Sequence, residues 1–150
     1  MKTHRILLIG ALLCLAVPAA ADSVKDKVDF VTQIYSVPIG SRELGNVRFS
    51  KEIQFLEKRR DWINSRPGSL GLDCEAFSEI IPGNAGIEPD FFKHPVKVTA
   101  LHNGRIRAEF FNAGEKEQVD LAVSCSKKFC QVDDVFYRGV SYKNSLKQCR

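Results

Sequence analysis

The chain has 150 residues, a length that suits one ordinary domain around a single hydrophobic core. Its 22 Lys and Arg residues are nearly balanced by 18 Asp and Glu residues, which excludes the strongly basic composition of a nucleic-acid binder. Beyond the N-terminal segment, no apolar stretch reaches the roughly 20 residues that cross a bilayer. We therefore predict a protein without a transmembrane segment and without a nucleic-acid partner.

The first 21 residues have the pattern of a cleaved signal peptide. Lys2 and Arg5 precede an apolar run over residues 6–17, and three alanines, the last of them Ala21, form a cleavage site of small residues. Cys14 follows Leu13 instead of the small residue that lipidation requires. We expect export to the periplasm and a single domain over residues 22–150, in which 20 basic residues face 18 acidic ones after Lys2 and Arg5 are removed.

Two amphipathic helices are predicted before any strand. Ser23 can cap the first helix, with Asp26 in the capping-box position, and Pro38 ends it. Ser50 starts the second, which ends at residues 65–68. One stripe of the second helix holds Ile53, Leu56, Arg60 and Ile63, and a neighbouring stripe holds Phe55, Arg59 and Trp62.

A basic run, Lys58 to Arg60, lies within the second helix. It fits either a contact patch for an anionic partner or a solvated helix face, and we favour the solvated face. Asp73 is then expected to cap a short third helix through Ile81, and residues 82–95 show no regular period.

Residues 96–110 change to the period of a strand hairpin. A three-residue loop with Gly104 as a left-handed bulge residue places Val98 opposite Ala108, and Lys97 opposite Glu109. A two-residue Asn-Gly turn would instead mix apolar and charged residues on each face. We therefore predict the three-residue loop.

A second hairpin is predicted over residues 119–137, with Cys125 opposite Cys130. Its alternation slips after Val132, and a bulge at Asp133 and Asp134 restores the pairing of Leu121 with Val135. Ser141 then caps a C-terminal helix with Tyr142, Leu146 and Cys149 on one side. Helices followed by a long-stranded antiparallel sheet predict an α+β domain, its N-terminal helices packed on a curved, cone-shaped sheet with a pocket.

Four cysteines remain after cleavage, and an even count in an oxidising compartment indicates two disulfides with three possible connectivities. The hairpin register favours Cys125–Cys130, which leaves Cys74–Cys149. The spacing of Cys125 and Cys130 differs from that of zinc knuckles and of redox motifs, so we expect neither a metal nor another cofactor.

Two short motifs resemble a family of small periplasmic proteins of unknown function with the nuclear transport factor 2-like (cystatin-like) fold. Residues 72–77, LDCEAF, are similar to that family's Leu-Asp-x-Asp-Pro-Phe, with Glu75 and Ala76 as departures. Residues 130–135, CQVDDV, followed by Tyr137 and Gly139, are similar to its closing Trp-x-Ile-Asp-Asp-Val strand. The resemblance implies a fold and a compartment, but no activity.

Several polar residues are candidates for a binding site, each beside a structural interpretation. The bulge acids fit either a pocket site or caps of backbone N–H groups, and we favour the caps. The acids near residue 74 fit either a contact for a cation or basic partner or a helix cap. Turn histidines are usually solvated. The candidate binding residues are Asp73, Glu75, His102, Asp133, Asp134 and Tyr137.

Three functional classes fit the sequence. The absence of a nucleophile elbow, a zinc-binding HExxH motif and a phosphate loop favours a noncatalytic periplasmic binding or accessory protein. Its partner would be an envelope protein or a small ligand. An immunity or inhibitor protein that blocks an envelope-acting toxin or enzyme is the alternative. A small pocket enzyme that uses Asp133 or Asp134 with His102 is the second alternative.

Overall fold

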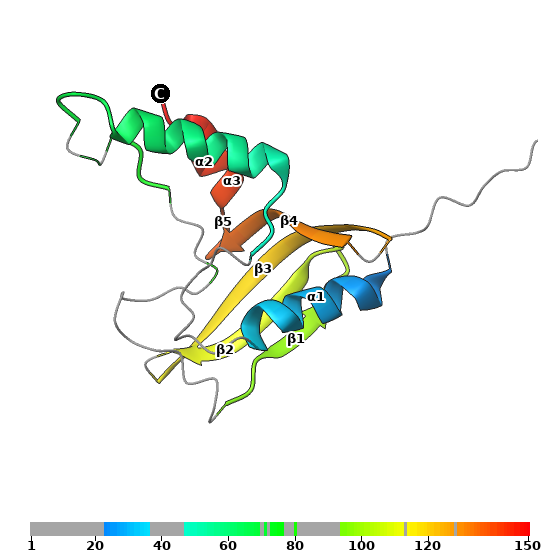
Figure 1. Cartoon of the computed structure of the whole chain (residues 1–150). Helices are drawn as coiled ribbons and strands as arrows, with labels where there is room; N and C mark the ends of the chain where they lie inside the picture. The colour runs from blue at the N-terminus through cyan, green and yellow to red at the C-terminus, as the bar shows by residue number, and fades with distance from the viewer. Residues whose placement is uncertain are drawn as a thin grey trace, which may run out of the picture.

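The computed structural model of the chain describes residues 23–36, 47–69, 71, 73–76, 80, 94–112, 114–127 and 129–150. The predicted signal peptide, residues 1–21, lies outside these residues. Three helices and a five-stranded antiparallel sheet make up the described part, which confirms the α+β class (Figure 1). The elements are α1 (Val24–Ser36), α2 (Lys51–Asn64), β1 (Lys97–Ala100), β2 (Ile106–Asn112), β3 (Glu115–Ser126), β4 (Phe129–Tyr137), β5 (Val140–Ser141) and α3 (Tyr142–Gln148).

The three helices begin at the serines that the sequence marks as caps. Ser23 Oγ accepts a hydrogen bond of 3.3 Å from the backbone N–H of Asp26. Ser50 and Ser141 do the same at α2 and α3 for the residues three positions further along. A side-chain oxygen at this position satisfies an N–H group that has no partner within the helix, so these serines fix where each helix starts.

The sheet has the strand order β1-β2-β3-β4-β5, and both predicted hairpin registers are confirmed. Lys97 lies opposite Glu109 and Val98 opposite Ala108. Gly104 has a φ of 81°, the left-handed conformation that the three-residue loop requires, and glycine adopts it without a steric cost. The alternation of apolar and polar residues therefore determined this register.

The β3–β4 hairpin contains the bulge at the predicted place. Val123 pairs with Val132 and Ala122 pairs with Asp134, so Asp133 is the extra residue of β4. Beyond the bulge, Leu121 lies opposite Val135 as predicted. Because one added residue restores the alternation, the same face of β4 remains apolar on both sides of the bulge.

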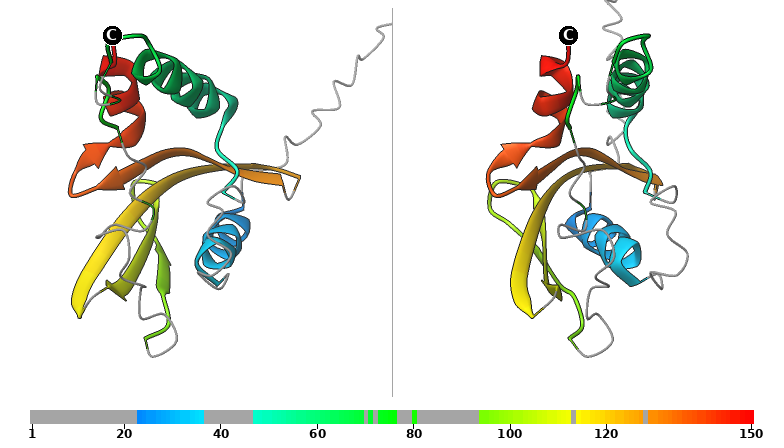
Figure 2. Two further views of the ribbon diagram at one scale, coloured as in Figure 1. Left: turned by 60° about the vertical axis from the view of Figure 1, so that its left-hand side comes forward. Right: turned by 90° about the vertical axis from the view of Figure 1, so that its left-hand side faces the viewer.

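The sheet curves, and the helices lie on two sides of its last long strand. Figure 2 shows α1 inside the curve of the sheet, with α2 and α3 beside each other beyond β4. Helix α1 contacts β1, β2, β3 and β4, whereas α2 contacts α3 and β4. The expected packing of helices on a curved sheet is thus present, with α1 across the face and α2 against β4.

A short backbone connection fixes the start of α2 to the sheet. The N–H of Ser50 donates to the carbonyl of Val132 at 2.9 Å, and the N–H of Val132 donates to the carbonyl of Arg48 at 2.8 Å. These bonds make a parallel bridge between Phe49 and Val132. The chain therefore passes from the edge of β4 directly into α2. Its bridge partner on β4, Val132, is the residue before Asp133 of the bulge.

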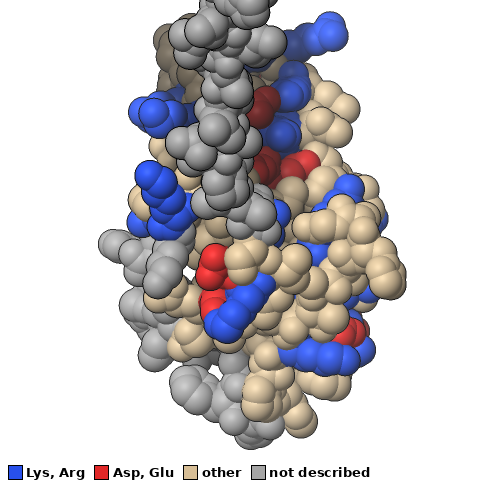
Figure 3. Space-filling view, turned by 90° about the vertical axis from the view of Figure 1, so that its right-hand side faces the viewer, with Lys and Arg blue, Asp and Glu red and all other residues tan. Residues whose placement is uncertain are grey.

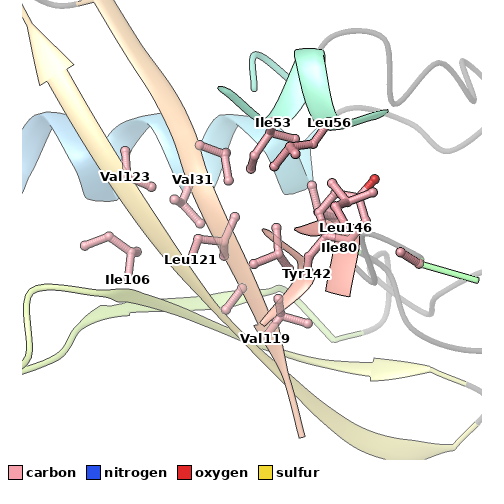
Figure 4. Close-up of a cluster of buried hydrophobic side chains, with 14 of the residues drawn as sticks. Val31, Ile53, Leu56, Ile80, Ile106, Val119, Leu121, Val123, Tyr142 and Leu146 are labelled. Carbon is pink, nitrogen blue, oxygen red and sulfur yellow. The ribbon is translucent and has the colours of Figure 1, made fainter. Parts of the chain in front are cut away.

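The buried apolar side chains form one cluster that joins α1 and the sheet to α2 and α3 (Figure 4). Val31 of α1 is fully buried against the sheet residues Leu121 and Val123. On the other side, Ile53 of α2 and Leu146 of α3 are also fully buried. A continuous core of this kind stabilises the described part as a single body.

Both predicted disulfides are present. Cys125–Cys130 joins facing residues of the β3–β4 hairpin, and Cys74–Cys149 joins the segment after α2 to the end of α3. In contrast, the expected helical cap at Asp73 is wrong, because residues 73–76 form bends and irregular backbone. The predicted helix continued through Ile81. Of its later residues, only Ile80 is among the described residues, and 77–79 and 81 lie outside them.

None of the helices in the described ranges has both the length and the apolar character needed to cross a membrane.

Candidate functional site

The carboxylate of Asp134 joins β4 to α3. Its Oδ1 accepts hydrogen bonds of 2.9 Å from the backbone N–H groups of Val135 and Lys143, and its Oδ2 accepts one of 2.6 Å from the hydroxyl of Ser141. Asp134 is buried. The first two bonds are the backbone capping that the bulge interpretation predicts, and together the three bonds give this carboxylate a structural role.

Asp133, the added residue of the bulge, is half-buried. Its Oδ1 accepts a hydrogen bond of 3.1 Å from the side-chain amide of Gln131. That amide also donates to Ser124 on the neighbouring strand, at 3.3 Å. Asp133 therefore belongs to a local side-chain network on β3 and β4, separate from the bonds of Asp134.

Tyr137 lies at the far end of β4, on the face of the sheet that carries the core. Its hydroxyl donates to Glu117 at 3.1 Å, and Arg138 approaches the same carboxylate at 3.4 Å. The side chain of Glu117 is only 13% exposed. Because neighbouring residues of a strand alternate between faces, Tyr137 and Asp134 point to opposite sides of the sheet.

The remaining candidates lie elsewhere in the fold. His102 is exposed in the turn between β1 and β2, and Asp73 and Glu75 are exposed on either side of Cys74. The six predicted site residues thus occupy four separate places. Among the residues that the structure describes, no three His, Cys, Asp or Glu side chains are grouped so as to hold a metal ion.

The outward face of α2 carries two large aromatic side chains. Phe55 is 68% exposed and Trp62, the single tryptophan of the chain, is 63% exposed. They are seven residues apart, and Arg59 lies between them on the same stripe, since positions separated by three or four residues share a helix face. The opposite face of α2, with Ile53, is buried in the core.

Basic side chains surround these aromatic rings. The guanidinium of Arg66 lies over the ring of Trp62, 5.1 Å from its centroid. Lys58 and Arg59 are exposed beside it, and Lys51 is exposed one turn before Phe55. We name this surface the α2 face, and it consists of Lys51, Phe55, Lys58, Arg59, Trp62 and Arg66.

The acids of α2 are engaged by groups outside this surface. Glu52 forms ion pairs with Lys147 at 2.7 Å and with Lys143 at 3.5 Å, and the hydrogen bond from Lys147 lowers the pKa of this carboxyl most strongly. Asp61 pairs with the guanidinium of Arg60 at 2.8 Å. The α2 face therefore keeps its positive charge.

A buried tyrosine fixes the orientation of α2 against α3. The hydroxyl of Tyr142 donates to Glu57 at 2.7 Å and accepts from Arg60 at 3.0 Å. Burial and the bond to Glu57 raise the pKa of Tyr142 well above its ordinary value. Arg60 also donates to the carbonyl of Ala76 at 3.0 Å, so the loop after α2 is held by the same group.

Comparison of the chain with protein-family models, curated proteins and solved structures found no significant match.

The α2 face was visible in the sequence as a stripe but was not assigned to binding. The signal was the presence of Arg59 between Phe55 and Trp62, because a charged side chain in the middle of an aromatic stripe is unsuited to a core. The buried stripe also contains an arginine, Arg60, so this signal alone does not separate the two stripes. In the structure Arg60 bonds to Tyr142 and Ala76, whereas Phe55 and Trp62 are exposed.

Proposed function

We propose that this protein is an exported, noncatalytic binding protein that recognises a protein partner through the α2 face. The observation that carries the proposal is the exposure of Phe55 and Trp62 on one face of a helix whose other face is core. Tryptophan and arginine are the residues most enriched among those that dominate binding energy at protein interfaces. Both occur here in direct contact.

The rigidity of the surface supports a binding role. Disulfide Cys74–Cys149, the bond of Arg59 to the carbonyl of Cys149 and the Tyr142 network all hold α2 against α3. Side chains that are ordered before association lose less conformational entropy when they bind. The helix that carries the α2 face, and Arg59 on it, are therefore held in place before a partner binds.

The location in the cell follows in part from the disulfides. Two of them indicate an oxidising compartment outside the cytosol. We propose the periplasm specifically, on the signal-peptide pattern of residues 1–21 and on the resemblance to a periplasmic family with the nuclear transport factor 2-like fold. The partner would then be another protein of the cell envelope.

An immunity or inhibitor protein is a more specific form of the same proposal. A face that combines a preorganised aromatic pair with cations suits the obstruction of an enzyme or toxin surface. The noncatalytic choice over a pocket enzyme rests on the positions of the polar residues. Asp134 is engaged in three structural hydrogen bonds, and His102 lies in a separate exposed turn.

Affinity purification from a periplasmic extract, followed by mass spectrometry, tests the proposal. The wild-type protein should enrich a specific partner, and Trp62→Ala should lose it. Phe129→Ala is the matched control, because Phe129 is also exposed, at 56%, and also carries a stacked arginine, Arg48, at 3.7 Å. Loss of the partner with the control variant, and retention with Trp62→Ala, would refute the proposed surface.

A further inference from the structure

We propose that the partner presents acidic side chains around an apolar contact, because the α2 face combines aromatic groups with two lysines that no carboxylate among the described residues pairs with. This inference rests on the proposed function and specifies the chemistry of the partner's surface.

The first step is the distribution of charge on α2. Glu52 and Asp61 are paired with Lys147 and Arg60, which lie outside the α2 face. Among the described residues, no carboxylate forms an ion pair with the two lysines of the face, Lys51 and Lys58. Complementary charge steers association and suppresses wrong partners. Four cations around two aromatic rings therefore select an acidic surface.

The second step is the orientation of the two arginines. Arg59 donates one hydrogen bond to the carbonyl of Cys149 at 2.7 Å, and Arg66 donates to the carbonyl of Ile63 at 3.2 Å and to the main-chain oxygen of Arg150 at 3.4 Å. A guanidinium has five N–H donors, so each arginine keeps donors for a partner while its position is fixed. Such prepositioned donors favour carboxylates, which accept two bonds from one guanidinium.

Charge elsewhere on the surface is mixed. On the side of the molecule drawn in Figure 3, Lys and Arg side chains are spread over the surface and Asp and Glu side chains lie among them. Several of these cations are paired within the fold, as Lys116 is with Glu109 at 2.7 Å. Lys51 and Lys58 of the α2 face have no such pair among the described residues, and they lie beside two exposed aromatic rings.

A protein is favoured over an anionic membrane as the occupant. A helix that lies in a membrane surface buries a broad apolar face in the lipid. The broad apolar face of α2 is already in the core, with Ile53, Leu56 and Ile63 buried. The large apolar side chains that α2 leaves exposed are Phe55 and Trp62, with arginines beside them, and aromatic and arginine residues of this kind dominate the binding energy of protein interfaces.

The test uses defined probes: two 12-residue peptides that share the same leucines and differ in four Glu or four Gln residues, and vesicles containing 30% phosphatidylglycerol. Binding is measured by NMR on the isotope-labelled protein, with the indole N–H of Trp62 as the reporter. We expect the Glu peptide to bind about tenfold more tightly than the Gln peptide, and both to shift the Trp62 signal.

Two double variants test whether the lysines of the α2 face account for the preference for the Glu peptide. Lys51→Gln with Lys58→Gln should weaken binding of the Glu peptide and narrow its advantage over the Gln peptide, with the remainder due to Arg59 and Arg66. Lys25→Gln with Lys127→Gln changes net charge equally at exposed residues outside the α2 face and should leave binding unchanged. Equal binding of the two peptides by the wild-type protein would overturn the inference, as would a failure of both to shift the Trp62 signal. Binding of the vesicles at Trp62 with no binding of the Glu peptide would overturn it in favour of a lipid surface.

These outcomes separate the inference from the proposed function. If a partner is lost with Trp62→Ala but binds equally well to the variant lacking Lys51 and Lys58, the α2 face is the interface and the acidic partner is wrong. If the partner is retained with Trp62→Ala, the proposed function itself fails.

Discussion

The carboxylate of Asp134 accepts a hydrogen bond of 2.9 Å from the backbone N–H of Lys143, nine residues further along the chain. The acid is at the bulge of β4 and its donor is in the first turn of α3. Since α2 packs on α3, this bond connects the curvature of the sheet with the position of the α2 face. A local irregularity of one strand thus contributes to the placement of the proposed interface.

Replacement of Asp134 is expected to destabilise the protein more than replacement of Asp133. Asp134→Ala removes the acceptor of two backbone N–H groups and of the Ser141 hydroxyl, which should lower the free energy of unfolding by about 2–4 kcal/mol. Asp133→Ala removes a single half-buried bond and should cost less than about 1 kcal/mol. Urea denaturation of both variants measures the difference, and equal losses would contradict the structural assignment.

The two disulfides are expected to differ in their contributions to stability. Cys74–Cys149 spans 75 residues and Cys125–Cys130 spans five. In the loop-entropy description, the longer closure contributes about 4–5 kcal/mol and the shorter about 2 kcal/mol. Double replacement of each pair by alanine, followed by chemical denaturation, tests this order. A larger loss from removal of Cys125–Cys130 would show that hairpin packing outweighs chain entropy.

Stability should fall at alkaline pH because of buried tyrosines. Burial raises the pKa of Tyr35, and burial with the Glu57 bond raises the pKa of Tyr142, so both stay protonated in the folded protein above pH 10. The unfolded chain loses these protons near pH 10, binds fewer protons than the folded state there, and is favoured as pH rises further. Tyr142→Phe should make this decline shallower when the free energy of unfolding is measured from pH 8 to 11. An unchanged slope would show that Tyr142 takes no part in it.

The exposure of Trp62 can be checked without a partner. As the single tryptophan of the chain, it reports the α2 face directly, and the residue is 63% exposed. We expect acrylamide to quench its fluorescence nearly as efficiently in the native protein as in urea. Strong protection of the native fluorescence from acrylamide would mean that Trp62 is covered in solution. Trp62→Ala should change the free energy of unfolding by less than about 1 kcal/mol, as exposed substitutions usually do.

The sheet was predictable because its signals are local. Alternation placed Val98 opposite Ala108, and the slip after Val132 located the bulge to within one residue. The serine caps at the starts of α2 and α3 could also be predicted from the sequence, because capping depends on residues three positions apart. Apolar periodicity and capping therefore predicted the elements and the hairpin pairings.

The long-range contacts were not predictable from the same patterns. Nothing near Asp134 in the sequence indicates its bond to the N–H of Lys143, and nothing near Phe49 indicates its bridge to Val132. The two stripes of α2 each contain an arginine, and their burial depends on where α3 packs. At Asp73 a capping signal was present without a helix in residues 73–76, where Cys74 is held by the side chain of Asn64 and by its disulfide.

Hydroxyl-radical footprinting of the purified complex tests the proposed interface most directly. The protein is oxidised alone and with the partner captured in the affinity purification, and modification of each aromatic residue is measured by mass spectrometry. We predict that the partner protects Trp62 and Phe55 and leaves Phe129, which is similarly exposed, unchanged. Protection of Phe129 with continued oxidation of Trp62 and Phe55 would place the interface elsewhere and contradict the binding role of the α2 face.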